Sequence, residues 1–126
     1  MSKKIAIIED DIEISDMYKI KLELGGYVIV SAENGTDGLK LIKSEKPDLV
    51  LLDLLLPEKD GYEVMEELKK SNDPYIKSLP IVVISNLSNE DDILEAKNLG
   101  ATDFLVKAKI NPASVLEKVN LVLQAK

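Results

Sequence analysis

The chain alternates short apolar runs with longer amphipathic segments from one end to the other, and this alternation constrains the fold more than any other feature. The apolar runs have the length of strands, and most are rich in Val or Ile, which favour strands. They lie at residues 5–8, 28–32, 49–53, 81–85 and 104–106. Strands that alternate with helical segments are typical of βα units around a mostly parallel sheet. The sequence therefore predicts an α/β fold.

The remaining segments predict five helices. In the first, Ile14, Met17, Ile20 and Leu24 recur at helical spacing, and the two glycines that follow are a stop signal. The second helix is expected at about residues 36–45, the third from near Gly61 to about residue 71, the fourth between Asn89 and Gly100, and the last from Pro112 with Asn111 as its N-cap. Residues 71–80 are predicted to form the longest loop.

Length and charge limit what the chain can do. With 126 residues it has the size of one domain, so we expect a single domain over residues 1–126, without room for a separate output module. The formal net charge is −7, from 16 basic and 23 acidic residues, and the lysines are scattered. This distribution argues against direct binding of nucleic acid or of an anionic membrane.

Four residue types are absent from the chain, namely Cys, His, Trp and Arg. Their absence excludes thiol chemistry, imidazole acid–base catalysis, Cys/His zinc sites and arginine fingers. Carboxylates, hydroxyls and lysines remain as reactive groups. The first apolar run, at residues 5–8, is too short for a signal peptide core or a membrane span, so a cytoplasmic location is expected.

Four of the five predicted strands end in polar groups. Glu9, Asp10 and Asp11 follow the first strand, Asp53 closes the third, Ser85 closes the fourth and Lys107 follows the fifth. Right-handed crossovers place all carboxyl ends of a parallel sheet on the same edge, so these groups are predicted to converge. Each also has an ordinary explanation: the acids favour a helix start, Asp53 a turn, Ser85 loop backbone groups and Lys107 solvent.

Taken together, these groups predict a phosphoryl-transfer site. Crowded carboxylates repel one another and are normally stabilised by a cation, and an all-oxygen site suits Mg²⁺ or Mn²⁺. A carboxylate beside such a metal can attack phosphorus, which gives an aspartyl phosphate. A lysine and a serine can then hold the remaining phosphoryl oxygens.

With these residues in place, the chain resembles a response-regulator receiver domain of two-component signalling, of the stand-alone, chemotaxis-regulator-like kind, over essentially its whole length. The motifs that carry the resemblance are Ile7-Ile8-Glu9-Asp10-Asp11, Leu51-Leu52-Asp53 with Pro57 and Asp60-Gly61, Ile84-Ser85, and Gly100-Ala101-Thr102-Asp103-Phe104-Leu105-Val106-Lys107. The resemblance implies a flavodoxin-like, doubly wound sheet of five parallel strands in the order 2-1-3-4-5, with five helices. In such sheets ligands bind at the switch point between the first and third strands.

The resemblance also implies a phosphoacceptor and a metal site. Asp53 would accept the phosphoryl group from a partner histidine kinase or phosphotransfer protein. Asp10, Asp53 and the backbone carbonyl of Leu55 would bind Mg²⁺, and Glu9 would act through the metal's water shell. Asp11 lies one place beyond the acidic pair and is predicted to cap the first helix.

The remaining matched residues imply a switch. Lys107 would contact the phosphoryl group, Ser85 would be the switching hydroxyl, and Phe104 the aromatic that changes rotamer; core packing is an equally good explanation of Phe104. A downstream protein would dock on the face formed by the fourth helix, fifth strand and fifth helix. Since no output domain follows Lys126, we expect the signal to pass through a partner, unless the chain is a fragment of a longer regulator. The chain is expected to be a signalling module rather than an enzyme.

Several positions depart from the family pattern. Ala108 stands where a proline usually follows the lysine, so that peptide bond need not be cis. Asn86 replaces a small residue, and the absence of arginines removes charged pairs that one large subfamily uses to dimerise. Leu55 and Leu87 are apolar and cannot position a hydrolytic water, which predicts a long-lived phosphorylated state.

Two other functions fit part of the pattern. A Mg²⁺-dependent phosphohydrolase with an aspartate nucleophile usually carries a second acid two residues later, and here that position is Leu55. A degenerate receiver used only as a scaffold is disfavoured by the intact set of Asp10, Asp53, Ser85 and Lys107.

Overall fold

The computed structural model describes residues 2–87 and 89–124, so the outer limits of the expected domain, Met1 and Lys126, lie outside the described residues. Five parallel strands form one sheet in the order β2-β1-β3-β4-β5, as expected. The strands are β1 (Lys4–Ile8), β2 (Val28–Ala32), β3 (Leu49–Leu52), β4 (Ile81–Ser85) and β5 (Asp103–Val106). Their limits differ from the predicted ones by one residue at most.

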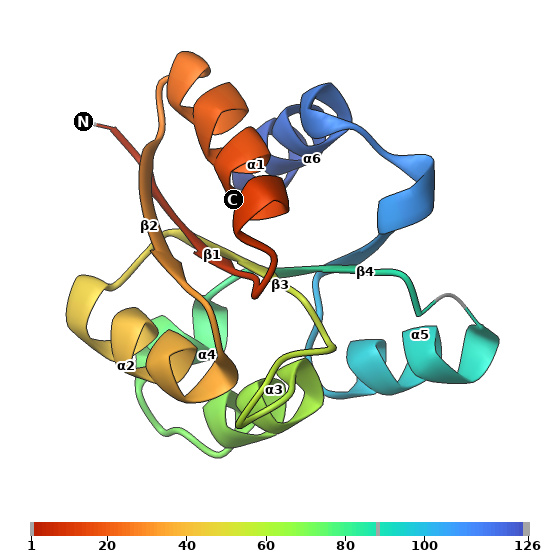
Figure 1. Ribbon diagram of the computed structural model, residues 1–126. Helices are drawn as coiled ribbons and strands as arrows, with labels where there is room; N and C mark the ends of the chain where they lie inside the picture. The colour runs from red at the N-terminus through yellow and green to blue at the C-terminus, as the bar shows by residue number, and fades with distance from the viewer. Residues whose placement is uncertain (1, 88, 125–126) are drawn as a thin grey trace.

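Helices cover both faces of this sheet (Figure 1). They are α1 (Ile12–Leu24), α2 (Gly35–Glu45), α3 (Gly61–Lys69), α4 (Pro74–Ser78), α5 (Glu90–Asn98) and α6 (Pro112–Gln124), with a short 3₁₀ turn η1 (Lys107–Lys109) after β5. Helices α1 and α6 pack on one face, and α2, α3, α4 and α5 lie on the other. The buried apolar residues accordingly form two clusters, one on each side of the sheet. None of these helices combines the length and the apolar character that crossing a membrane requires.

The prediction of five helices was wrong because α4 lies within the segment expected to be the longest loop. Asp73 caps this short helix by accepting a hydrogen bond from the backbone nitrogen of Tyr75 at 2.9 Å, and Pro74 occupies the first helical position. The Tyr75 hydroxyl donates a hydrogen bond to the carbonyl of Pro47. This contact ties the helix to the segment before β3, a long-range partner that local sequence does not reveal.

Most of the apolar residues that predicted α1 do not lie on its buried face. Met17, Ile20 and Leu24 are 50%, 60% and 80% exposed, whereas Tyr18 and Leu22 are buried. Tyr18 and Leu22 belong to the apolar cluster under β1 and β3. Helical spacing therefore identified the helix; of the four residues that carried it, Ile14 packs against this cluster and the other three are exposed.

The structure confirms the cap residues predicted for α1, α5 and α6. Asp11 accepts a hydrogen bond from the backbone nitrogen of Ile14 at 3.2 Å, so it caps α1. Asn89 caps α5 in the same way through Asp92, and Asn111 accepts from the backbone nitrogen of Ser114 at 2.9 Å. Lys107 and Ala108 lie in η1, and the described peptide bonds there are trans.

The segment after β3 is held by the start of α3. A Cβ atom on Gly61 would lie 2.4 Å from the carbonyl oxygen of Asp53, so only glycine fits there. The Gly61 nitrogen donates to the carbonyl of Leu54 at 2.9 Å. Asp60 and Glu63 form a reciprocal capping box in front of the helix.

Replacing Asp60 with alanine is expected to lower the free energy of unfolding by about 1 kcal/mol, because the first turn of α3 loses its side-chain acceptor. Urea unfolding monitored by circular dichroism measures the change. Asp91→Ala is the matched control, since Asp91 is an exposed acid in the first turn of α5 but is not the cap residue of that helix. Equal stability of Asp60→Ala and the wild type would contradict the role of the capping box.

Candidate functional site

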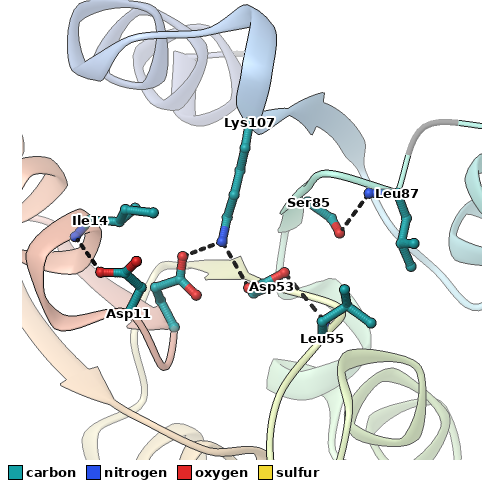
Figure 2. Close-up of polar contacts among 8 residues, drawn as sticks. Asp11, Ile14, Asp53, Leu55, Ser85, Leu87 and Lys107 are labelled. Atoms are coloured by element: carbon teal, nitrogen blue, oxygen red, sulfur yellow. Dashed lines mark hydrogen bonds and ion pairs between the residues drawn. The ribbon is translucent and has the colours of Figure 1, made fainter.

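The carboxyl ends of the strands bring together acidic and basic side chains from distant parts of the sequence (Figure 2). The strand β1 is in register with β3, with Ile8 beside Leu52, so Glu9 and Asp53 follow neighbouring positions. The Asp53 nitrogen donates to the carbonyl of Ile8 at 3.0 Å, which extends the pairing by one residue. Lys107 reaches the same place from the end of β5.

Lys107 lies between two buried carboxylates. Its Nζ atom is 2.9 Å from Oδ2 of Asp53 and also donates a hydrogen bond to Oε1 of Glu9. Glu9 and Asp53 are 3% and 6% exposed. The other oxygen of Asp53, Oδ1, accepts from the backbone nitrogen of Leu55 at 3.3 Å. Each oxygen of the Asp53 carboxylate therefore accepts a hydrogen bond.

Three carboxylates lie close enough to share one cation. Oxygen atoms of Glu9, Asp10 and Asp53 all lie within 4.8 Å of one another, and Asp10 is the exposed member of the group. The second oxygen of Glu9, Oε2, is buried and has no hydrogen-bond partner within the described chain. An unpartnered buried acceptor beside two other acids fits a divalent cation or its bound water, and the all-oxygen donor set suits Mg²⁺.

Burial and the neighbouring charges shift the pKa values of Glu9 and Lys107. Burial raises the pKa of Glu9 from 4.5 to about 7; the hydrogen bond and charge of Asp53 add to the rise, while Lys107 opposes it. For Lys107, burial alone would lower the pKa, but the hydrogen bonds and charges of Glu9 and Asp53 outweigh it and raise the pKa above its ordinary value. The lysine is therefore held as an ammonium between the acids.

Ser85 and Phe104 occupy different surroundings from the three acids. Ser85 is fully buried, and its hydroxyl oxygen accepts from the backbone nitrogen of Leu87 at 3.2 Å, within its own loop. Phe104 lies beside Val83 in the sheet and packs, half-buried, against the apolar cluster on the α3 and α5 side. The structure thus brings Ser85 to the same edge as Asp53 and gives Phe104 a packing role.

Tyr18 is a residue of the site that sequence reasoning missed. It lines a small cavity of about 10 Å³ together with Glu9 and Asp53. Burial raises the pKa of its hydroxyl above 10.0. The spacing of Ile14, Tyr18 and Leu22, each four residues after the previous one, was the available signal, because these positions share one face of a helix.

Comparison with known sequences identifies close relatives. The chain is 34% identical to the protein PilH of Pseudomonas aeruginosa, over 95% of this chain and 97% of PilH. It is 33% identical to the alkaline phosphatase synthesis transcriptional regulatory protein PhoP of Bacillus subtilis, over 98% of this chain but 50% of PhoP. It spans about half the length of several such relatives, among them the probable transcriptional regulator ycf27 of Porphyridium aerugineum, at 35% identity and 48% coverage.

Solved structures show the same architecture. A CheY-like response regulator receiver domain protein from Methanospirillum hungatei has 29% sequence identity and a TM-score of 0.89, covering 99% of this chain and 96% of that one. The BeF3-activated receiver domain of RstA from Klebsiella pneumoniae has 31% identity and a TM-score of 0.82, covering 94% and 96%. The family of response regulator receiver domains matches residues 5–120. The chain therefore belongs to the response regulator receiver domain family, whose members are signalling modules of two-component systems.

Proposed function

We propose that this receiver domain is phosphorylated on Asp53 by a partner histidine kinase or phosphotransfer protein, and that phosphorylation changes a protein-binding surface. The observation that carries the proposal is the position of Lys107, 2.9 Å from Oδ2 of Asp53 at the end of β3. A buried carboxylate that is held by an ammonium and by a backbone N–H has a fixed orientation for attack on phosphorus.

Lys107 has two roles in this proposal. Its charge compensates Asp53 and Glu9 before the reaction, and afterwards it binds an oxygen of the phosphoryl group. Because its side chain is only 14% exposed, water screens the interaction weakly. A charge-assisted hydrogen bond of this kind is about twice as strong as one between neutral groups.

We assign the metal to Asp10, Asp53 and the backbone carbonyl of Leu55, with Glu9 acting through a bound water. The cluster of oxygens within 4.8 Å supports this assignment. Mg²⁺, or Mn²⁺ in its place, would offset the charge of the incoming phosphoryl group. The chain's own residues hold the nucleophile and exclude water around it, since Glu9 and Asp53 are both buried.

The proposed switch begins at Ser85. A phosphoryl group adds about two negative charges and new acceptor oxygens. The Ser85 hydroxyl, which accepts from Leu87, would turn to donate to the phosphoryl group, and Phe104 would follow it. Shifting a mostly inactive population to a mostly active one needs roughly 5 kcal/mol. Two or three charge-assisted hydrogen bonds are sufficient for this.

The output surface in this proposal is the face formed by α5, β5 and α6, which are the fourth helix, fifth strand and last helix of the sequence prediction. A downstream protein would bind there, in the cytoplasm, without direct contact to nucleic acid or membrane. The chain's net charge of −7 supports the exclusion of nucleic acid. Phosphohydrolase activity is disfavoured because Leu55, in the place of the second acid, is apolar and 58% exposed.

The test is intact-mass spectrometry after treatment with acetyl phosphate and Mg²⁺. One added phosphoryl group on the wild-type chain supports the proposal. No added mass would favour a scaffold that is never phosphorylated.

The phosphorylated state is expected to be long-lived, because Leu55 and Leu87 offer no polar group to position a hydrolytic water. Within the described residues, both leucines form hydrogen bonds near the site through their backbone N–H groups, to Asp53 and Ser85. Leu55→Gln with Leu87→Gln is expected to speed dephosphorylation by about tenfold, less than the roughly 100-fold or more of a positioned proton-transfer group, because an amide orients water without accepting its proton. The decay is followed by intact mass, with Leu121→Gln, an exposed position on α6, as the control. Unchanged decay in the double variant would reject this explanation.

A further inference from the structure

A groove of about 550 Å³ lies between α1 and α2, beside the carboxyl end of β2. The strand β2 is an edge of the sheet, since it pairs only with β1. Its Ser31 and Ala32 line the groove, together with Ile12 of α1 and Leu41 of α2. The groove therefore lies at the carboxyl end of an edge strand. The ribbon places β2 between α1 and α2 (Figure 1).

The groove side of β2 carries backbone groups that the sheet does not use. Val28 donates to the carbonyl of Lys3 at 3.0 Å, and the carbonyl of Ala32 accepts from Glu9 at 3.1 Å. Alternate residues of a strand face the same neighbour, so Val28 and Ala32 face β1 while Ile29 and Ser31 face away from it. An edge strand with free N–H and C=O groups is a template for another strand.

The side chains around the groove give it a negative charge. Four carboxylates and one ammonium line it, on Glu9, Asp16, Glu33, Asp37 and Lys40. In the part of the chain that the structure describes, no lysine lies within ion-pair distance of Asp16, Glu33 or Asp37. These three acids are exposed and available to a cationic partner.

An extended peptide matches both walls of the groove. Successive side chains of a strand point to opposite faces, so one set would meet α1 and the other α2. Each wall offers one apolar and one acidic contact: Ile12, 57% exposed, with Asp16 on α1, and Leu41 with Asp37 on α2. A segment that carries both basic and apolar side chains would satisfy the walls while its backbone pairs with Ile29 and Ser31.

We propose that this groove binds an extended segment of a partner protein, rich in lysine or arginine, which adds a strand to the sheet beside β2. Charge complementarity favours such a partner over a second copy of the chain. Two copies, each with a net charge of −7, would bring their acidic rims together. The binding does not depend on phosphorylation of Asp53, so it can be tested separately from the proposed function.

The probe is a short, dye-labelled peptide that alternates lysine with valine, added to the unphosphorylated protein. Fluorescence anisotropy is expected to show saturable binding. Amide hydrogen exchange followed by NMR is expected to show about tenfold or greater protection of the Ile29 and Ser31 amides, because both gain hydrogen bonds. The same peptide with alternate backbone nitrogens methylated cannot pair along one edge and is expected not to bind.

Two variants test the walls and the edge separately. Asp16→Asn with Glu33→Gln is expected to weaken binding by about tenfold, whereas Glu66→Gln with Asp91→Asn, the same charge change on α3 and α5, is expected to leave it unchanged. Ser31→Pro removes one outward N–H at a position where edge strands tolerate proline, and it is expected to abolish protection of the bound edge.

The following results would overturn the proposal. The first is equal binding of the methylated and unmethylated peptides, which would show charge attraction without strand pairing. The second is no saturable binding, or amide changes confined to α5, β5 and α6. The third is a dimer, detected by sedimentation, that protects Ile29 and Ser31 without peptide, since the occupant would then be a second copy.

Discussion

Treatment with acetyl phosphate and Mg²⁺ is expected to add about 80 Da to the wild-type chain, one phosphoryl group, and nothing to Asp53→Asn. The carboxamide has nearly the shape of the carboxylate but is neutral, so its remaining oxygen is a poor nucleophile. Asp53 is 6% exposed and is held by Lys107 and by the Leu55 nitrogen, so the substitution removes the reactive group without leaving a cavity. The expected effect is complete loss of labelling.

The control for this experiment is Asp91→Asn, which changes the same group on the exposed side of α5. It is expected to gain the same mass as the wild type. Both variants should unfold at temperatures near that of the wild type, which excludes misfolding as the cause of lost labelling. Labelling of Asp53→Asn at the wild-type level would show that another residue is the acceptor.

Replacing Glu9 with glutamine is expected to stabilise the metal-free protein at pH 8 but not at pH 4.5. The pKa of Glu9 is raised from 4.5 to about 7 by burial and by Asp53, so the folded state binds a proton that the unfolded state releases. Glu9 therefore lowers stability progressively as the pH rises from 4.5 to about 7, and the loss is complete above that range. The shift corresponds to about 3 kcal/mol.

The measurement is urea unfolding of the wild type and Glu9→Gln at several pH values in the presence of a chelator. The difference in unfolding free energy should grow between pH 4.5 and 7 and then remain constant. Glu66→Gln, an exposed position on α3, serves as the control and should show no such trend. A constant difference across the whole range would mean that Glu9 is ionised throughout, with Lys107 outweighing burial.

The strands were predictable from sequence because each is a short apolar run with a clear end. Leu49 to Leu52 are all buried, and the acid that follows them marks the end of the strand. Helix starts were predictable for a similar reason, since Asp11 and Asn111 act through backbone groups three residues away. Such signals are contained in a few neighbouring residues.

The features that escaped prediction depend on distant partners. Both sides of α1 carry apolar residues, and the packing of Tyr18 and Leu22 onto the sheet decides which side is buried. The short helix α4 is tied to Pro47 through Tyr75, a partner 28 residues away. At the site, the residue types indicated the chemistry, but the shared contact of Lys107 with Glu9 as well as Asp53 required the assembled sheet.

The contact of Lys107 with both Glu9 and Asp53 links the centre of the sheet to its edge strand β5. Lys107 begins the turn that leads from β5 toward α6, while its ammonium is bound at the ends of β1 and β3, on the far side of β4. A change of charge on Asp53 would therefore act on the end of β5 through the Lys107 side chain, without passing through β4. One side chain thus connects Asp53 to the segment that leads to α6.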